Sequence, residues 1–110
     1  DITIFGDGRQ TRAFCFVSDM VDGLVRLMAT PDEVTGPINL GNPVEHTIEA
    51  LARRIIGLVG SDSNLTLSPA PVDDPRQRLP DISRARAVLS WSPHVDLDAG
   101  LAQTIAYFRE

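Results

Sequence analysis

Arginine is the residue type of this chain best suited to binding a charged ligand. All ten basic residues are arginine and there is no lysine. A guanidinium offers a planar fork of donors that matches two phosphate oxygens, and it stays charged in a partly dry cleft. Arg12 follows a Gly6-Asp7-Gly8 turn signal, while Arg76 and Arg78 lie in a proline-bounded stretch. Taken singly, each would more often be a solvated side chain. Together they are candidates for binding phosphate.

The absence of lysine removes a lysine nucleophile, a Schiff base and the Tyr-x-x-x-Lys pair of short-chain dehydrogenases. The one tyrosine, Tyr107, has no lysine after it and is expected to be half-buried packing. We therefore assign no catalytic residue, and we expect the chain alone to be inactive.

The glycines Gly6 and Gly8 could begin a dinucleotide fingerprint, Gly6-x-Gly8-x-x-Thr11. The third glycine is missing, and the residues that follow have strand character, so a phosphate would meet no helix N-terminus. The pattern predicts a plain β-turn, and we assign no cofactor-binding residue.

Other reactive residue types are too few or too poorly spaced for a site. Cys15 stands alone beside His46 and His94, so no metal ligand set is predicted. We expect Cys15 to be a buried, unreactive thiol and His46 an exposed turn residue. Asp73 and Asp74 are adjacent on a loop, where capping of the loop is a better account than paired acid and base chemistry.

Composition points to a small domain without a polyanionic partner. With 110 residues and 43% hydrophobic residues we expect one core, and the net charge of −5 argues against nucleic acid and anionic membranes. A lone cysteine fits the cytoplasm, and neither a signal peptide nor a membrane span is indicated. The apolar run at residues 2–5 follows Asp1 directly, so we expect a start within a longer protein.

The apolar patterns alternate between strand and helix, which predicts an α/β fold. Strands are expected at residues 2–5, 13–17, 37–40 and 65–67. Helices are expected at four places: up to Met28 with Ser18 or Asp19 as cap, after Thr47 up to Gly60, after Asp81 or Ser83, and from Leu97 to Phe108. Residues 69–75 contain three prolines and are expected to form a loop or linker, and buried Trp91 is expected to anchor the C-terminal helices.

Four motifs, taken in order, resemble the C-terminal portion of the UDP-glucuronic acid decarboxylases. They are Gly6-Asp7-Gly8-x-Gln10-Thr11-Arg12-Ala13-Phe14, Asn39-Leu40-Gly41-Asn42-Pro43, Asp73-Asp74-Pro75-x-x-Arg78-x-Pro80-Asp81 and Leu89-x-Trp91-x-Pro93. These enzymes belong to the extended short-chain dehydrogenases, in the NAD-dependent epimerase/dehydratase family. The resemblance covers essentially all 110 residues, and the Asp-Asp-Pro-x-x-Arg-x-Pro-Asp string is its most specific part.

The resemblance implies that residues 1–110 are a small mixed substrate-binding domain, and that the N-terminal Rossmann half, which binds NAD and carries the catalytic residues, lies outside them. The reaction implied is oxidation of C4 of UDP-glucuronate by NAD, loss of the C6 carboxylate as carbon dioxide, and return of the hydride to give UDP-xylose. Carried over by position, Arg78 would bind the diphosphate or ribose and Arg12 would line the same cleft. Arg76 falls on a variable position and is the weaker candidate.

Alternatives remain open at this point. A dTDP-glucose 4,6-dehydratase or a UDP-sugar 4-epimerase would share the same turn and phosphate arginines, and a stand-alone binding module is an alternative of another class. The resemblance also implies that the parent is a homodimer through its Rossmann half, so this part could be a monomer.

Overall fold

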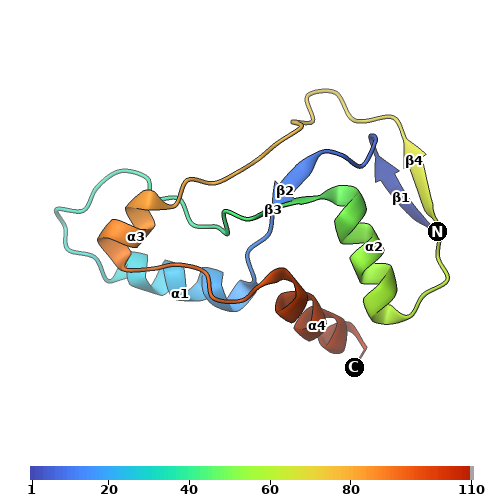
Figure 1. Cartoon of the computed structure of the whole chain (residues 1–110). Helices are drawn as coiled ribbons and strands as arrows, with labels where there is room; N and C mark the ends of the chain where they lie inside the picture. Colours follow the sequence, from blue (N-terminus) through green and yellow to red (C-terminus); the bar gives the residue numbers. More distant parts are fainter. Residues whose placement is uncertain (110) are drawn as a thin grey trace. The chain divides into compact units, whose positions relative to one another are not determined.

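The structure is a computed structural model that describes residues 1–109 (Figure 1). Its elements are, in chain order, β1 (Ile2–Phe5), β2 (Thr11–Ala13), α1 (Val17–Met28), β3 (Glu45–Thr47), α2 (Ile48–Val59), β4 (Leu65–Ser68), α3 (Ser83–Leu89) and α4 (Leu97–Phe108). Helices and short strands alternate, which confirms the predicted α/β class.

The chain divides into two compact units, which corrects the expectation of one core. Unit 1 comprises Asp1–Arg12, Glu45–Arg78 and the described part of Leu101–Glu110, and unit 2 comprises Ala13–Val44 and Leu79–Gly100. Neither unit is continuous in sequence, so composition and length alone could not reveal the division.

Unit 1 contains a parallel pair of strands, β1 and β4, which lie side by side in Figure 1. Their register pairs Ile2 with Leu65 and Ile4 with Leu67, and Ile4 is buried. Helix α2 begins as predicted, because the Thr47 hydroxyl accepts the N–H of Ala50 at 3.1 Å. It ends at Gly60, whose left-handed φ of 67° suits a residue without Cβ.

Two predicted strands are wrong in position. The strand expected at 13–17 is displaced to β2, which ends at Ala13, and helix α1 begins at Val17. Residues 37–40 form no strand. Ile38 and Leu40 instead pack on the apolar cluster of unit 2, so their alternation reflects burial without sheet pairing. The strand that pairs with β2 is β3, Glu45–Thr47, whose polar sequence gave no strand signal.

The core of unit 2 is a cluster of Ile82, Ala85, Leu89 and Trp91. Trp91 is 1% exposed and its indole N–H donates to the Asp19 carbonyl oxygen at 3.0 Å, so the buried tryptophan was predicted correctly. Helix α1 approaches this cluster closely, because a Cβ at Gly23 would lie 3.1 Å from the Trp91 ring. A larger residue at position 23 would therefore push the helix off the core.

The start of α1 differs from the prediction of a Ser18 or Asp19 cap. Phe16 holds the N-cap position without a side-chain cap, and Asp19 lies within the first turn. The Asp19 carboxylate is turned to the core and accepts the N–H groups of His94 and Val95 at 3.0 and 2.9 Å. A buried carboxylate needs such donors, so tertiary contacts took precedence over capping.

At the start of α3 the outcome is closer to the prediction. The Asp81 carboxylate accepts both the N–H of Ser83, at 2.9 Å, and the Ser83 hydroxyl, although Ile82 occupies the N-cap position. These bonds lower the pKa of Asp81, with the Ser83 hydroxyl as the larger cause and the Ser83 N–H next.

Helix α4 forms where predicted, but Tyr107 is not half-buried. Its exposed fraction is 70%, and its ring meets that of Phe108 edge-on at 5.2 Å. Among residues 1–109 no helix is long and apolar enough to cross a membrane.

Candidate functional site

The glycine turn between β1 and β2 is held against the start of α2. Gly6 and Gly8 have φ values of 118° and 80°, which confirms a turn that requires glycine. The Gly8 carbonyl oxygen accepts the N–H of Glu49 at 3.0 Å, and the Gln10 carbonyl oxygen accepts that of Ile48, also at 3.0 Å. The first amides of α2 are thus occupied by the turn itself.

The same turn does not fit the pyrophosphate of NAD. A dinucleotide turn leads into a helix whose free amides face the phosphates, whereas this one leads into strand β2. A Cβ at Gly8 would lie 3.0 Å from the Cβ of Glu49, so the space beside the glycine is filled by protein.

The loop after β4 runs back along β2. Residues 69–75 form no helix, as the prolines predict, and Asp74 N–H closes a turn onto the Pro71 carbonyl oxygen at 3.3 Å. Further along, the N–H of Thr11 donates to the Arg76 carbonyl oxygen at 2.8 Å, and Thr11 forms a parallel bridge with Gln77. Arg12 follows Thr11 and Arg78 follows Gln77. Because the bridge is parallel, the backbone of unit 1 brings the two arginines to the same position along the two paired segments.

The Arg12 side chain is held by two hydrogen bonds and keeps further N–H donors for a ligand. Its side chain is 18% exposed, and its two terminal nitrogens donate to the Asp74 carboxylate and to the Thr11 carbonyl oxygen, both at 2.7 Å. A guanidinium has five N–H donors, so further donors remain for a ligand. The guanidinium is oriented before any ligand arrives, which lowers the entropy cost of binding.

Arg78 and Arg76 differ in how their charge is used. The Arg78 side chain is exposed and makes no hydrogen bond or ion pair with any other residue that the structure describes. Arg76 pairs with Asp7 at 2.9 Å and so ties the loop to the glycine turn. The N–H of Arg9 and, next, the Arg76 guanidinium lower the pKa of Asp7. Arg78 therefore retains its full binding capacity, and Arg76 has a structural partner.

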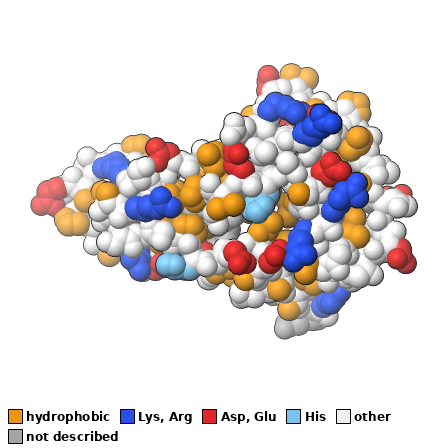
Figure 2. Space-filling view, in the orientation of Figure 1, with side chains coloured by type: hydrophobic (Ala, Val, Ile, Leu, Met, Phe, Trp, Pro, Cys, Tyr) orange, Lys and Arg blue, Asp and Glu red, His pale blue; other side chains and the backbone are white. Residues whose placement is uncertain are grey.

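Charges of both signs lie close together over this loop. Figure 2 shows arginine side chains beside acidic ones at the upper right, where the loop after β4 runs in Figure 1. The acidic neighbours matter because each one competes with an anionic ligand for the arginines.

Sequence reasoning missed Asp74 and Gln10 as parts of this region. The expectation that Asp74 caps its loop is wrong for its carboxylate, which accepts from Arg12. Gln10 is 6% exposed, and its amide donates to the Phe5 carbonyl oxygen at 2.9 Å while its Oε1 has no partner among the described residues. The place of Gln10 between the glycine turn and Arg12 was the available signal.

The remaining reactive residues form no site. No group of three or more His, Cys, Asp or Glu side chains within residues 1–109 could hold a metal ion. Cys15 is half-buried, and desolvation, followed by the nearby Asp19 charge, raises the pKa of its thiol, so it is a poor nucleophile. His46 lies in β3 and is half-buried, not an exposed turn residue.

Comparison with solved structures defines the class. UDP-glucose 4-epimerase from Thermotoga maritima, solved with UDP-glucose, matches 99% of this chain and 35% of its own with a TM-score of 0.92 and 30% identity. UDP-glucuronic acid 4-epimerase from Bacillus cereus, solved with UDP-glucuronic acid and NAD, matches 97% of this chain and 34% of its own with a TM-score of 0.89 and 31% identity. The NAD dependent epimerase/dehydratase family matches residues 1–41. The fold is that of a part of these nucleotide-sugar enzymes.

Comparison with curated sequences points to one group of nucleotide-sugar enzymes, the UDP-glucuronic acid decarboxylases. UDP-glucuronic acid decarboxylase 1 of Xenopus tropicalis is 50% identical over 109 residues, which are 99% of this chain and 25% of the relative. UDP-glucuronic acid decarboxylase 3 of Arabidopsis thaliana is 51% identical over 100 residues, 91% of this chain and 29% of the relative. The chain thus spans about a quarter of the length of the curated relatives it matches. It is related to one segment of the UDP-glucuronic acid decarboxylases, which confirms the resemblance inferred from its motifs.

Proposed function

We propose that this chain is the nucleotide-sugar-binding part of a UDP-glucuronate decarboxylase, with Arg12 and Arg78 binding the diphosphate. The observation that carries the proposal is the Thr11–Gln77 bridge, which brings two arginines from distant motifs to one level of unit 1. Two arginines brought together along the backbone can supply the positive charge and the paired N–H donors that a diphosphate needs. The half-identical decarboxylase relatives supply the substrate class.

The two arginines have different tasks in this proposal. Arg12 is pre-oriented by Thr11 and Asp74 and offers its remaining donors to one phosphate group. Arg78 is free in the described structure and closes on the other phosphate group or on the ribose. Arg76 acts mainly by tying the loop to Asp7, so its loss should affect binding less.

The parent protein would convert UDP-glucuronate to UDP-xylose and carbon dioxide, with NAD held by residues outside this chain. In support, the matching family is NAD dependent, and the Bacillus cereus neighbour was solved with NAD. The glycine turn between β1 and β2 does not fit NAD, and the chain has no lysine for a Tyr-x-x-x-Lys pair. Residues 1–110 would then be the C-terminal substrate-binding portion of a cytoplasmic enzyme, inactive without its Rossmann half.

Titration with UDP tests the binding claim. We expect weak, saturable NMR shift changes centred on residues 9–12 and 74–79, because part of the cleft belongs to the parent. Arg78→Ala should weaken UDP binding about tenfold, the loss of one charge-assisted phosphate contact. Arg53→Ala is the matched control: the Arg53 side chain is 66% exposed and, among residues 1–109, forms its ion pair with Glu49 of the same helix, so its removal should leave UDP affinity unchanged. Identical affinities of wild type and Arg78→Ala would contradict the assignment.

A UDP-sugar 4-epimerase is the second candidate, because solved epimerases share the fold at high TM-scores. The higher sequence identity to decarboxylases favours the first candidate. Incubation of the full-length parent with UDP-glucuronate separates them: a decarboxylase releases carbon dioxide and a UDP-pentose, whereas an epimerase gives an isomeric UDP-uronate of unchanged mass.

A further inference from the structure

The carboxylate of Asp74 occupies one terminal nitrogen of Arg12, a donor that a diphosphate can also use. The Arg12 terminal nitrogen and Asp74 Oδ1 are 2.7 Å apart, and the two side chains are 18% and 29% exposed. A carboxylate and a phosphate edge present the same acceptor geometry to a guanidinium. Resting on the function proposed above, we propose that Asp74 is a displaceable counter-ion that holds Arg12 in the absence of nucleotide and yields it to the diphosphate.

The loop that carries Asp74 is built to release it. Asp74 lies in the proline-bounded stretch without helix or strand, and its preceding residue, Asp73, adopts a left-handed φ of 67° that is unfavourable for a residue with Cβ. The loop is anchored independently by the Thr11–Arg76 backbone bond and the Asp7–Arg76 ion pair. Breaking the Asp74–Arg12 pair therefore need not detach the loop from β2.

Electrostatics give the direction of the effect. A negative charge beside Arg12 repels an incoming phosphate and also has to be displaced from the guanidinium, so Asp74 lowers the affinity for the anion. Its benefit is to keep a partly buried guanidinium paired and oriented while the site is empty. Replacement by asparagine removes the charge but keeps an oxygen that can accept from Arg12, so it separates the charge of Asp74 from its orienting role.

The test is UDP titration of Asp74→Asn at low salt, with Asp73→Asn as matched control. Asp73 lies on the same loop, carries the same charge and is exposed. We expect Asp74→Asn to bind UDP and inorganic pyrophosphate about fivefold more tightly than wild type, an effect the size of one partly exposed ion pair. Asp73→Asn should change affinity much less, and uridine, which has no phosphate, should not distinguish the variants.

Two further titrations, in the Arg12→Ala background and at high salt, show what a negative result would mean. In Arg12→Ala the added Asp74→Asn change should give a much smaller gain, because the competition for the guanidinium is gone and only the direct repulsion of the phosphate remains. Near 1 M salt the gain in the wild-type background should also shrink. If Arg78→Ala weakens UDP binding but Asp74→Asn fails to tighten it, Asp74 only positions Arg12, and this inference falls while the proposed function stands. If no variant binds UDP or pyrophosphate, both proposals fail. Preserved NMR spectra of each variant outside residues 9–12 and 72–79 check that it is folded.

Discussion

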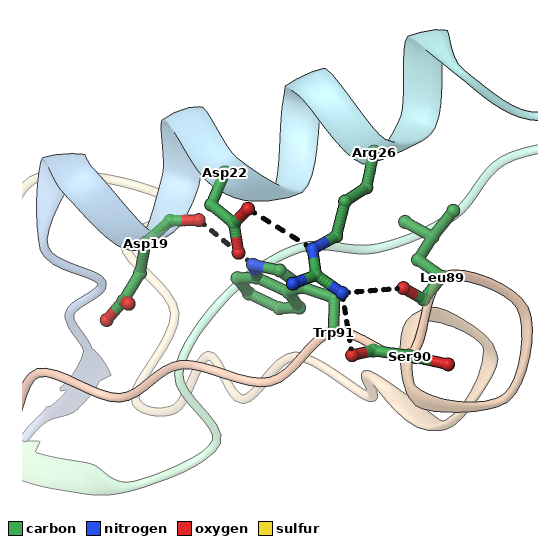
Figure 3. A network of polar contacts seen from close by, with 6 residues as sticks. All are labelled: Asp19, Asp22, Arg26, Leu89, Ser90 and Trp91. Carbon is green, nitrogen blue, oxygen red and sulfur yellow. Dashed lines mark hydrogen bonds and ion pairs between the residues drawn. The ribbon is translucent and has the colours of Figure 1, made fainter.

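Arg26 in unit 2 and Arg78 in unit 1 show two opposite uses of one residue type. Arg26 donates to Asp22 at 3.2 Å and to the carbonyl oxygens of Leu89 and Ser90 at 3.1 and 3.0 Å (Figure 3). It thereby caps the C-terminal end of α3, where cations are favoured. Arg78 makes no such bond within the described part of the chain. A guanidinium occupied by its own backbone stabilises the fold, whereas one left free is available for a ligand.

The same contrast separates the acidic residues. One carboxylate oxygen of the buried Asp19 accepts two backbone N–H groups, so removing it would leave those amides without a partner. Asp74 meets a single side chain on an exposed loop. The carboxylate of Asp19 is therefore tied to the backbone of unit 2, whereas that of Asp74 depends on one side-chain partner in unit 1.

The largest effect is expected from Trp91→Ala in the core of unit 2. This change removes a side chain that is 1% exposed and leaves a cavity beside Ile82 and Ala85, so the free energy of unfolding should fall by about 3–5 kcal/mol. Urea denaturation followed by circular dichroism measures it. Trp91→Phe keeps most of the packing but loses the bond to Asp19, so it should cost clearly less; equal losses would mean that packing is not the main contribution.

A smaller loss of stability is expected from Arg26→Ala. Two carbonyl groups at the end of α3 lose their donor, and we expect a destabilisation of about 1 kcal/mol because the side chain is 42% exposed. Arg26→Gln can restore one of the two bonds and should recover part of the loss. A destabilisation as large from Arg78→Ala would remove the distinction between the two arginines.

The smallest effect concerns pH. The pKa of Asp81 is lowered in the folded chain, so the bonds of Asp81 to Ser83 stabilise the start of α3 above the unfolded pKa, and this contribution is lost as pH falls through the folded pKa. An NMR titration should show the Ser83 amide shift following the Asp81 carboxyl group below its ordinary pKa. Ser83→Ala removes the largest cause, so the Asp81 pKa should rise; an unchanged value would refute this account.

The fold could be predicted from the sequence where the local signal and the tertiary contact agree. Thr47 and Gly60 bound α2 through their own side chain and backbone preferences, and Ile2–Phe5 and Leu65–Ser68 are apolar enough to be strands. The prediction failed where a distant partner decides. Asp19 has the sequence of a helix cap but serves backbone groups far along the chain, and β3 forms because β2 is beside it.

The candidate site could be predicted only in part for the same reason. The residue types of Arg12 and Arg78 and their motifs marked them as phosphate ligands, and the bridge between Thr11 and Gln77 is what places them at one level. Which arginine is paired, and with which acid, depends on how a proline-rich loop folds back. No periodic pattern encodes that choice, so the pairing of Asp74 with Arg12 could not be predicted from the sequence.

The most direct test of the central claim compares Arg78→Ala with Arg26→Ala. For each variant, the UDP affinity is measured by titration and the free energy of unfolding by urea denaturation. We predict that Arg78→Ala loses about tenfold in UDP affinity with stability unchanged, and that Arg26→Ala loses stability with UDP affinity unchanged. Unaltered UDP affinity in Arg78→Ala, or the same loss of affinity in Arg26→Ala, would contradict the claim that the free arginine of the loop binds the nucleotide.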